Sequence, residues 1–260
     1  MELDERNKKF SWSNVEPPFE VVTEAQARSY NEVGGFVLDG VFSVKEIAEL
    51  MEMLDPLESA SNDFLRSAKN KRVSIARADE IVFRPHAVTS GVRIKGYASH
   101  PLLAGLCRDL VGPAARLYWD QIVYKRPGAR ADFPWHQDNG YTFVEPQQYL
   151  TCWIALTDAN KENGCPWVAP GIHLLGTLQH KWTENGFQCL DQEPSDPIPM
   201  ELTAGSIAVF SSLSPHRTGP NSTEEIRKAY ILQYAEDGAI IHLEDGAVVK
   251  ADDPDRQFLI

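Results

Sequence analysis

Residues 133–140, FPWHQDNG, place a histidine two positions before an aspartate. Side chains along an extended strand alternate between two faces, so His136 and Asp138 are expected to share a face while Gln137 points away. An imidazole and a carboxylate on a common face are two of the three ligands in the two-histidine, one-carboxylate triad that binds non-haem Fe(II). A His-x-Asp pattern alone is weak, because short patterns recur by chance. The hypothesis therefore needs a second histidine from elsewhere in the chain.

The second half of the chain has the pattern of an all-β domain. From residue 116 onward, short apolar runs alternate with clusters of Gly, Pro and Asn; the runs are RLYWDQIVYKRP, TCWIALTDA, CPWVAP, GSIAVFSS and KAYILQYAE. Several short strands with such turns indicate a sandwich or barrel. The sequence lacks strand–helix alternation, a glycine-rich phosphate loop, Gly-x-Ser-x-Gly and His-Glu-x-x-His. The sequence therefore contains no motif that would indicate a nucleotide-binding or hydrolase function.

The first part of the chain is expected to contain helices. Capping-box patterns at Thr23 and Ser43 predict two helices, the second extending to Pro56. The apolar spacing over 101–111 predicts a third helix, closed by Gly and Pro. The pattern between residues 58 and 95 leaves a helix, a strand or a lid over a site open.

Composition limits the partners that the protein is expected to bind. The chain has 260 residues and an apolar fraction of 43%, enough for a substantial core. Its 37 acidic and 25 basic residues give a net charge of −12, which argues against nucleic acid and anionic membranes as partners. A small-molecule partner, neutral or cationic, fits this charge balance. The oligomeric state is left open.

The N-terminal residues and the cysteines indicate the compartment. Residues 1–14 are charged with no apolar run, and no stretch approaches the length of a membrane span. The four cysteines are widely spaced without a Cys-x-x-Cys pair, so reduced thiols are expected. We therefore expect a soluble, cytoplasmic protein.

The candidate for the second histidine is His216, in the segment SPHRTGP that follows the strand predicted over 205–212. This strand would deliver His216 to the mouth of the barrel. Eleven residues later Arg227 opens the last long strand, after a polar turn that lets the chain double back. A guanidinium there suits a carboxylate in bidentate geometry. The sequence thus predicts a metal-binding face with a permanent cation beside it.

These residues together resemble the Fe(II)/2-oxoglutarate oxygenases of the phytanoyl-CoA dioxygenase type. The resemblance covers nearly the whole chain and is carried by GGFV at 34–37, WHQD at 135–138, NGCPWVAPGIH at 163–173, SPHRT at 214–218 and Arg227. Each part is common by itself, whereas the combination is specific.

The resemblance implies a set of catalytic and cofactor-binding residues. His136, Asp138 and His216 would bind Fe(II), and Arg227 would pair with the distal carboxylate of 2-oxoglutarate. Further residues implied in the co-substrate pocket are Thr218, Gln121, Trp153 and Lys95, with Arg93 as an alternative to Lys95. His173, which lies in the turn Pro-Gly-Ile-His, is expected to be a structural hydrogen-bonding residue and not a ligand.

The fold implied is mainly β, a double-stranded β-helix (jelly-roll, cupin-like) core with flanking N-terminal α-helices. We expect one dioxygenase domain over 1–260. Residues 1–115 would form a helical or irregular part that includes the candidate lid, and residues 116–240 the jelly-roll core.

The implied reaction follows from the ligand set. Three protein ligands leave three iron positions on one face, two for chelation by 2-oxoglutarate and one for O2. The expected outcome is hydroxylation of an unactivated C–H bond of a small metabolite or natural-product intermediate, with release of succinate and CO2. Related halogenases have a small residue where this chain has Asp138, so hydroxylation or desaturation is favoured over halogenation.

Side chains near the metal-binding segments are the candidates for substrate contacts: Trp135, Asn139, Tyr141, Phe143, Trp167 and Arg217. An aromatic wall suits an apolar or ring-bearing substrate, although each aromatic fits the barrel core equally well. The acidic chain shows no basic cluster for an acyl-CoA.

Two alternatives remain from sequence. One is a cupin-like metalloenzyme that does not use 2-oxoglutarate, for which Arg227 would be dispensable. The other is a non-catalytic small-molecule-binding barrel, against which an intact ligand set argues. The substrate and the position oxidised are not decided.

Overall fold

The structure is a computed structural model that describes residues 1–129 and 132–260. Its largest element is an antiparallel sheet with the strand order β1-β13-β8-β15-β5-β4-β3-β2. The strands are β1 (Gly35–Leu38), β13 (Ile207–Ser211), β8 (Leu150–Ala155), β15 (Arg227–Glu236), β5 (Ala115–Lys125), β4 (Ile81–Pro85), β3 (Ala76–Arg77) and β2 (Arg72–Val73). The long strands β5 and β15 pair along nearly their whole length and form the centre of the sheet.

A second sheet faces the first and has the order β12-β9-β14-β6. Its strands are β12 (Ile198–Pro199), β9 (Pro166–Val168), β14 (His216–Thr218) and β6 (Phe133–His136). Trp153 and Phe210 from the large sheet and Val168 from the smaller one meet in one apolar cluster. Two antiparallel sheets around a shared interior are the jelly-roll arrangement. The predicted fold class, a mainly β double-stranded β-helix with N-terminal helices, is confirmed.

Short elements decorate the two ends of the barrel. The remaining strands are β10 (Lys181–Thr183) and β11 (Gly186–Gln188), which form a hairpin, and β7 (Phe143–Glu145), β16 (Ile240–His242) and β17 (Val248–Lys250), which form a small sheet. One-turn helices are η1 (Lys69–Lys71), η2 (Ala87–Ser90), η3 (Asp138–Gly140) and η4 (Ile172–Leu175).

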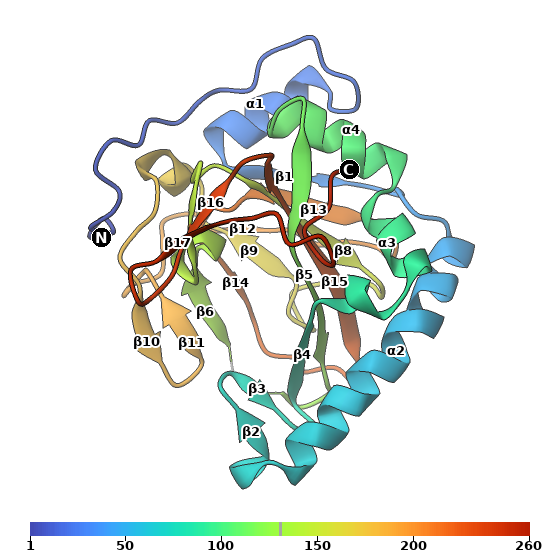
Figure 1. Cartoon of the computed structure of the whole chain (residues 1–260). Coiled ribbons are helices and arrows are strands. Elements are labelled where there is room, and N and C mark those ends of the chain that lie inside the picture. Colours follow the sequence, from blue (N-terminus) through green and yellow to red (C-terminus); the bar gives the residue numbers. More distant parts are fainter. Residues whose placement is uncertain (130–131) are drawn as a thin grey trace.

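Helices cover the outer face of the large sheet (Figure 1). They are α1 (Glu24–Glu32), α2 (Val44–Ser67), α3 (Val92–Ala98) and α4 (Pro101–Leu110). Leu54 of α2 and Leu103 of α4 belong to the same buried cluster as Ile154 and Tyr230 of the sheet. The outward side chains of the sheet are thus covered, and its inward side chains are left to line the interior. Within the described ranges, no helix is both long and apolar enough to cross a membrane.

Helix α2 continues through Pro56, so the expectation that it ends there is wrong. A proline inside a helix removes one backbone hydrogen bond, which other contacts must offset. The C-terminal half of α2 is held by Glu58, whose carboxylate accepts a hydrogen bond from Arg126 at 2.8 Å, and by Asn62, whose amide donates to Asp79 at 3.0 Å. These contacts fix α2 against the loops around β3 and β5.

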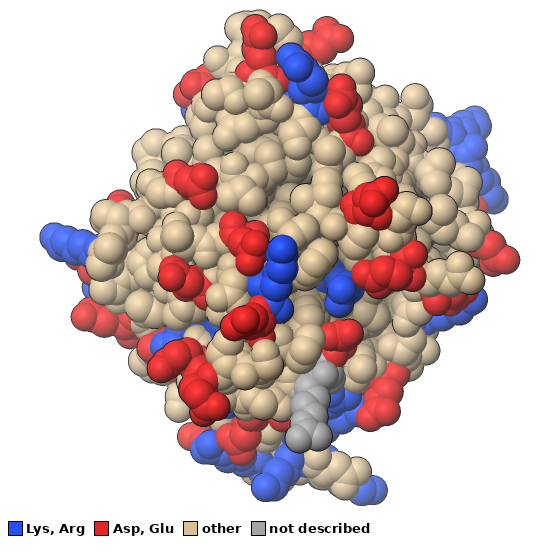
Figure 2. All heavy atoms as spheres, turned by 180° about the vertical axis from the view of Figure 1, so that it is seen from behind, with Lys and Arg blue, Asp and Glu red and all other residues tan. Residues whose placement is uncertain are grey.

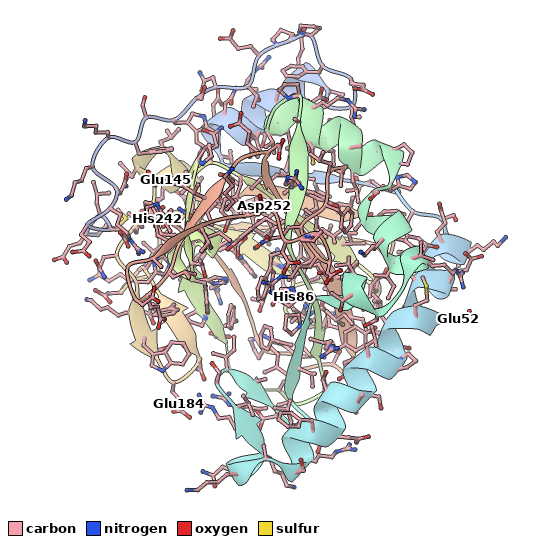
Figure 3. All side chains as sticks on the ribbon, in the orientation of Figure 1. Glu52, His86, Glu145, Glu184, His242 and Asp252 are labelled. Atoms are coloured by element: carbon pink, nitrogen blue, oxygen red, sulfur yellow. The ribbon has the colours of Figure 1, made fainter. Side chains whose placement is uncertain are left out.

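The segment from 58 to 95 is ordered in this structure into the end of α2, the hairpin β2–β3, β4, η2 and α3. The β2–β3 hairpin contacts the turn of the β10–β11 hairpin, where Glu184 stands (Figure 3). Arg72 pairs with Glu184 at 3.3 Å, and Arg77 donates to the Asn185 side chain at 2.6 Å. Two hairpins more than a hundred residues apart in sequence therefore touch at one end of the barrel.

Gly205 offers a test of how tightly the turn before β13 is built. Its φ is +89°, and a Cβ there would overlap the carbonyl oxygen of Phe42; Gly238 has a similar φ of +92° with nothing within 4 Å. We expect Gly238→Ala to cost about 1–2 kcal/mol through backbone strain alone. Gly205→Ala should cost about 1–3 kcal/mol more, because the Phe42 backbone must move. Chemical denaturation of both variants measures the difference, and equal losses would contradict the overlap.

Candidate metal centre

The register between β6 and β14 brings two histidines together. His136, the last residue of β6, and His216, the first of β14, are direct partners across the two strands. Their ring centroids lie 4.1 Å apart. Asp138 follows in η3 and not on a strand, but Gln137 is still extended, with φ −107° and ψ 143°. The expected alternation therefore holds, and the Gln137 amide points away into contacts with the carbonyl oxygens of Gly176 and Leu213.

One potential ligand atom from each of His136, Asp138 and His216 lies within 4.8 Å of the others. His216 Nε2 lies 3.7 Å from Asp138 Oδ1. Among the residues that the structure describes, this is the one group of three or more such side chains close enough to hold an ion. Two imidazoles and one carboxylate match the donor set of the non-haem Fe(II) triad.

The two imidazoles are held in the tautomer that a metal requires. His136 Nδ1 donates to the Pro134 carbonyl at 2.8 Å, and His216 Nδ1 donates to the Ser214 carbonyl at 3.0 Å. A carbonyl oxygen only accepts, so the proton stays on Nδ1 and the Nε2 lone pair is free. Burial, together with the neighbouring His216, lowers the pKa of His136 well below its ordinary value. The neutral imidazole, which is the metal-binding form, is thereby favoured.

Thr151 on β8 fixes the carboxylate. Its hydroxyl donates to Asp138 Oδ2 at 2.5 Å, while Oδ1 is the oxygen on the side of His216. Partners of this kind orient ligating groups and contribute to metal affinity. Sequence reasoning missed Thr151, although it lies two residues from Trp153 on the same inward face of the strand.

Arg227, the first residue of β15, is buried beside this centre. Its side chain lines the same interior cavity as His216, Thr218 and Trp153, and its guanidinium carbon lies 5.1 Å from the Trp153 ring centroid. None of its three guanidinium nitrogens has a hydrogen-bond partner in the described part of the chain. Burial lowers the pKa of Arg227 to about 10, so it keeps its charge at neutral pH. Burying a cation without a counter-charge is costly, and the described residues supply no counter-charge for Arg227.

The lysine beside Arg227 is not the one expected from the sequence. Lys95 lies on α3, where its ammonium is 5.3 Å from the Phe258 ring, so that prediction is wrong, as the helix packs on the outside of the sheet. Lys125 is instead fully buried and is the register partner of Arg227. Its ammonium donates to Thr218 Oγ1 at 3.3 Å and to the Gly219 carbonyl at 2.5 Å. The alternation of β5 could have identified it, because residues 121, 123 and 125 share one face.

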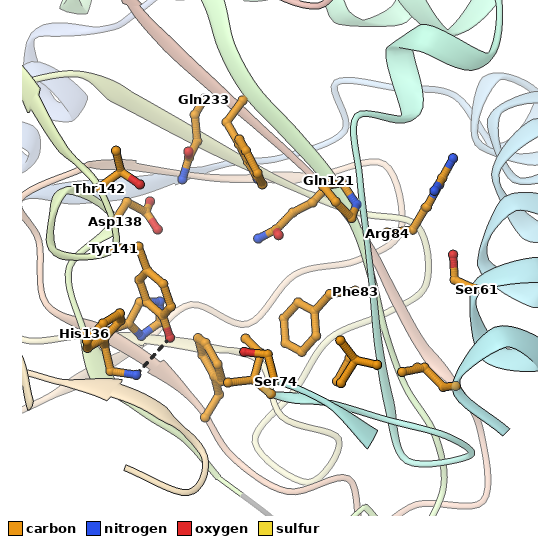
Figure 4. A pocket seen from close by; sticks show the side chains of 18 of the residues that line it. Ser61, Ser74, Phe83, Arg84, Gln121, His136, Asp138, Tyr141, Thr142 and Gln233 are labelled. Atoms are coloured by element: carbon orange, nitrogen blue, oxygen red, sulfur yellow. Dashed lines mark hydrogen bonds between the residues drawn. The ribbon is translucent and has the colours of Figure 1, made fainter. Parts of the chain in front are cut away.

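A larger cavity of about 810 Å³ opens from the triad toward α2. Figure 4 shows Asp138 and Tyr141 on one side of it and Phe83 on β4 on the other, with the amides of Gln121 and Gln233 between them. The wall is mainly aromatic and aliphatic and includes Phe83, Trp119, Phe133, Tyr141, Phe187 and Leu57. Gln121, His136 and Asp138 also line the inner cavity around Arg227, so the two spaces adjoin at the triad.

Of the predicted substrate contacts, Tyr141 lines this cavity and the others do not. Asn139 is buried and donates to Thr177 Oγ1 at 2.7 Å, so it holds the η3 turn. Phe143 packs against His242 at 5.4 Å and against the guanidinium of Arg6. These predictions fail because the chain turns immediately after Asp138 and carries the following side chains into the barrel end.

The remaining candidates form a cluster on the outer side of the small sheet. The Arg217 guanidinium lies over the rings of Trp135 and Trp167, at 5.4 and 5.3 Å, and pairs with Glu193 at 3.3 Å. The Trp135 indole also donates to Glu193, at 2.9 Å. Trp135, Trp167 and Arg217 are therefore structural, because strand alternation sends them away from the face that carries His136 and His216.

Histidines outside the triad make structural contacts, as expected for His173. His173 contacts the Asn31 carbonyl through Nε2 at 3.2 Å, outside the triad. His242 pairs with Glu145 at 2.8 Å, and the His86 ring packs against the Trp119 ring with their centroids 4.4 Å apart. His180 Nε2 accepts from the Gln137 backbone at 2.9 Å and so supports the segment that carries the ligands.

Comparison with known proteins agrees with this geometry. The family model for phytanoyl-CoA dioxygenase (PhyH) matches residues 30–229. The chain belongs to this family. It is 31% identical over 225 residues to the methylphosphonate hydroxylase of Gimesia maris, covering 82% of this chain and 80% of that protein. It is 24% identical over 254 residues to phytanoyl-CoA dioxygenase 1 of Oryza sativa subsp. japonica, covering 83% and 90% of the two proteins.

The fold of this phytanoyl-CoA dioxygenase family member also matches solved structures. The non-haem alpha-ketoglutarate-dependent carbocyclase SnoK from nogalamycin biosynthesis superposes with a TM-score of 0.69 at 21% identity, over 86% of this chain and 89% of that one. The resemblance predicted from sequence is confirmed, as are the reaction class and the cofactors. The protein is a non-haem Fe(II)- and 2-oxoglutarate-dependent dioxygenase, and it uses O2.

Acidic and basic side chains are interspersed over the face opposite that of Figure 1 (Figure 2). Among the described residues, this distribution leaves that face without an extended basic area of the kind that binds a nucleic-acid backbone. The expectation that nucleic acid is not a partner stays a prediction.

Replacing Thr151 tests the support of the carboxylate. We expect Thr151→Val, which keeps the shape and removes the hydroxyl, to weaken metal binding about 10- to 100-fold. Thr151→Ser keeps the donor and should bind within a few-fold of the parent protein. Anaerobic calorimetric titration with Fe(II) or Co(II) measures both, and equal affinities for the valine and serine variants would contradict the role of the hydroxyl.

Proposed function

We propose that this dioxygenase hydroxylates a C–H bond of a small organic molecule with a mainly apolar body. His136, Asp138 and His216 hold Fe(II), and Arg227 pairs with the distal carboxylate of 2-oxoglutarate in the inner cavity. The substrate occupies the larger cavity on the other side of the triad. The observation that carries the assignment is the buried guanidinium of Arg227, which has no partner among the described residues and lines one cavity with His216 and Asp138.

The residues around the triad fit Fe(II) and 2-oxoglutarate. Each imidazole presents Nε2, and Asp138 presents Oδ1. Fe(II) with 2-oxoglutarate and O2 supplies oxidative decarboxylation to succinate and CO2, coupled to oxygen insertion into the substrate. Arg227 offers two parallel N–H donors to a carboxylate, a geometry that a lysine cannot provide.

Thr218 and Lys125 position the co-substrate. The Lys125 ammonium donates to the Thr218 hydroxyl, so the Thr218 proton is free to point toward a carboxylate in the cavity. Burial and the nearby Arg227 charge lower the pKa of Lys125 well below its ordinary value. Lys125 thus contributes a hydrogen-bond donor next to Arg227 with a reduced electrostatic cost.

The aromatic side chains on the triad side of the large cavity exclude water. The Phe133 ring stands edge-on to His136 at 4.5 Å, and the Tyr141 ring at 5.4 Å. The Tyr141 hydroxyl accepts from the Phe187 backbone at 3.2 Å, which closes the wall between η3 and β11. Excluding water strengthens electrostatic interactions at the metal and limits unproductive side reactions.

The cavity supports a substrate larger than the one in the name of the Gimesia maris relative, methylphosphonate. A volume of about 810 Å³ is typical of sites for drug-sized ligands. Its aromatic and aliphatic lining suits an apolar or ring-bearing body, with Gln121 and Gln233 available as hydrogen-bonding groups. A small metabolite or natural-product intermediate of this character is the substrate class we assign.

Arg227 separates this function from a cupin-like metalloenzyme that does not use 2-oxoglutarate. We expect Arg227→Met to raise the KM for 2-oxoglutarate at least about 30-fold, the loss for truncating one partner of a buried charge pair. Metal affinity should stay within a few-fold, because Arg227 does not ligate the metal. Succinate formation from 2-oxoglutarate measures the effect, with the exposed Arg28→Gln as the charge-matched control.

The Arg227→Met variant is expected to lose activity but to gain stability. The metal-free, 2-oxoglutarate-free protein buries the Arg227 charge without a partner, so Arg227→Met should raise its melting temperature. Unchanged succinate formation in Arg227→Met, or loss of stability together with activity, would overturn the co-substrate role. Absence of metal binding by the parent protein, or equal metal affinity after His136→Ala, would overturn the triad.

A further inference from the structure

Arg84 on β4 is the second cavity-lining arginine without a carboxylate partner. Among the described arginines, all but Arg28, Arg84 and Arg227 have a carboxylate oxygen within 4.0 Å. Arg28 is exposed to solvent, and Arg227 is explained by the co-substrate. Arg84 lines the large cavity, and its Nε is buried without a partner. In a chain with 37 acidic residues against 25 basic ones, an arginine left unpaired in a cavity calls for an explanation.

The position of Arg84 sets it apart from the triad. Arg84 is the register partner of Ile122, and its neighbour Pro85 is the partner of Gln121. Side chains alternate along β4, so Phe83 faces the triad while Arg84 faces α2. Figure 4 shows the Arg84 side chain directed away from His136 and Asp138, toward the side of the cavity where Ser61 of α2 stands. The cavity thus has the metal site at one end and a guanidinium at the other.

The acidic group that acts on Arg84 through space, Asp120, is engaged by other groups through one of its two oxygens. Asp120 Oδ2 accepts a hydrogen bond from the Tyr230 hydroxyl at 2.9 Å and from the Val88 backbone at 3.1 Å, while Oδ1 is buried without a partner among the described residues. Burial raises the pKa of Asp120 to about 6, and the Arg84 charge only partly opposes that shift. No ion pair within 4.0 Å joins the two side chains, so the N–H donors of Arg84 stay open to a ligand in the cavity.

We propose that Arg84 binds an anionic group of the substrate, so that the substrate is an amphiphilic anion whose apolar body runs from Arg84 to the metal site. This inference rests on the proposed function and narrows its substrate class. A carboxylate, a sulfate monoester or a phosphate monoester would each match the planar N–H donors of a guanidinium. Leu57 and Phe83 line the same cavity and give it an apolar wall for the body of the substrate. The carbon that is oxidised is then remote from the anionic group.

Three ten-carbon probes test the proposal: decanoate, decyl sulfate and decanol. The protein is loaded with Ni(II) and 2-oxoglutarate under anaerobic conditions, and binding of each probe is measured by calorimetry. We expect at least one of the anions to bind the parent protein about tenfold or more tightly than decanol, the gain typical of a charge-assisted hydrogen bond. Arg84→Gln should remove this preference and leave decanol binding unchanged. Arg28→Gln should keep it, and the two anions distinguish a carboxylate from a sulfate site.

The outcomes that overturn the inference are distinct from failure of the proposed function. Equal binding of anions and decanol by the parent protein, no binding of any probe, or a preference that survives Arg84→Gln would each overturn the role of Arg84. The dissociation constant of 2-oxoglutarate and the melting temperature of Arg84→Gln serve as controls, because Arg84 lies outside the inner cavity. If 2-oxoglutarate itself fails to bind the parent protein with Ni(II), the proposed function fails instead.

Discussion

The pairing of β14 with β6 is the constraint on which the geometry of the candidate metal centre depends. It sets His216 directly opposite His136, and the same strand pairs with β9 on its other edge, where His216 meets Val168. A shift of one residue in this register would send the His216 side chain to the opposite face, where Arg217 now lies between two tryptophans. The tight contacts of Arg217 with Trp135 and Trp167 therefore hold the register that assembles the metal site on the other face.

The interior of the barrel carries an electrostatic cost that the proposed binding of 2-oxoglutarate would offset. Arg227 and Lys125 are register partners in adjacent strands and are both buried. Asp138 is the one carboxylate among the described residues that line the cavity around Arg227. Unpaired buried charges destabilise a folded protein. These basic groups lie on the inward face of the sheet, whereas helices cover the outer face with aliphatic side chains. The outer face therefore contributes stability, and the inward face carries the functional groups.

The sequence predicted most of the metal centre because its residues follow local rules. His136 and Asp138 are two positions apart in extended backbone, and His216 and Arg227 stand at the ends of recognisable strands. The prediction for Lys95 was wrong because no local pattern encodes which segment enters the barrel, whereas Lys125 was missed although it shares the inward face of β5 with residues 121 and 123. The aromatic residues after Asp138 were misplaced for a related reason: η3 turns the chain, and periodicity cannot indicate which wall a side chain joins after a turn.

The substrate cavity was the least predictable part, since its walls come from segments far apart in the sequence. Helix α2 supplies Leu57 and Ser61 only because it continues past Pro56, and β11 supplies Phe187 only because its hairpin meets β2–β3. The inner cavity and the large cavity share Phe83, Gln121, Phe133, His136 and Asp138 as lining residues. A molecule lying against these side chains in the large cavity stands between the inner cavity and the open side of the site. With 2-oxoglutarate beside Arg227 and the substrate in the large cavity, as proposed, this arrangement favours binding of 2-oxoglutarate before the substrate.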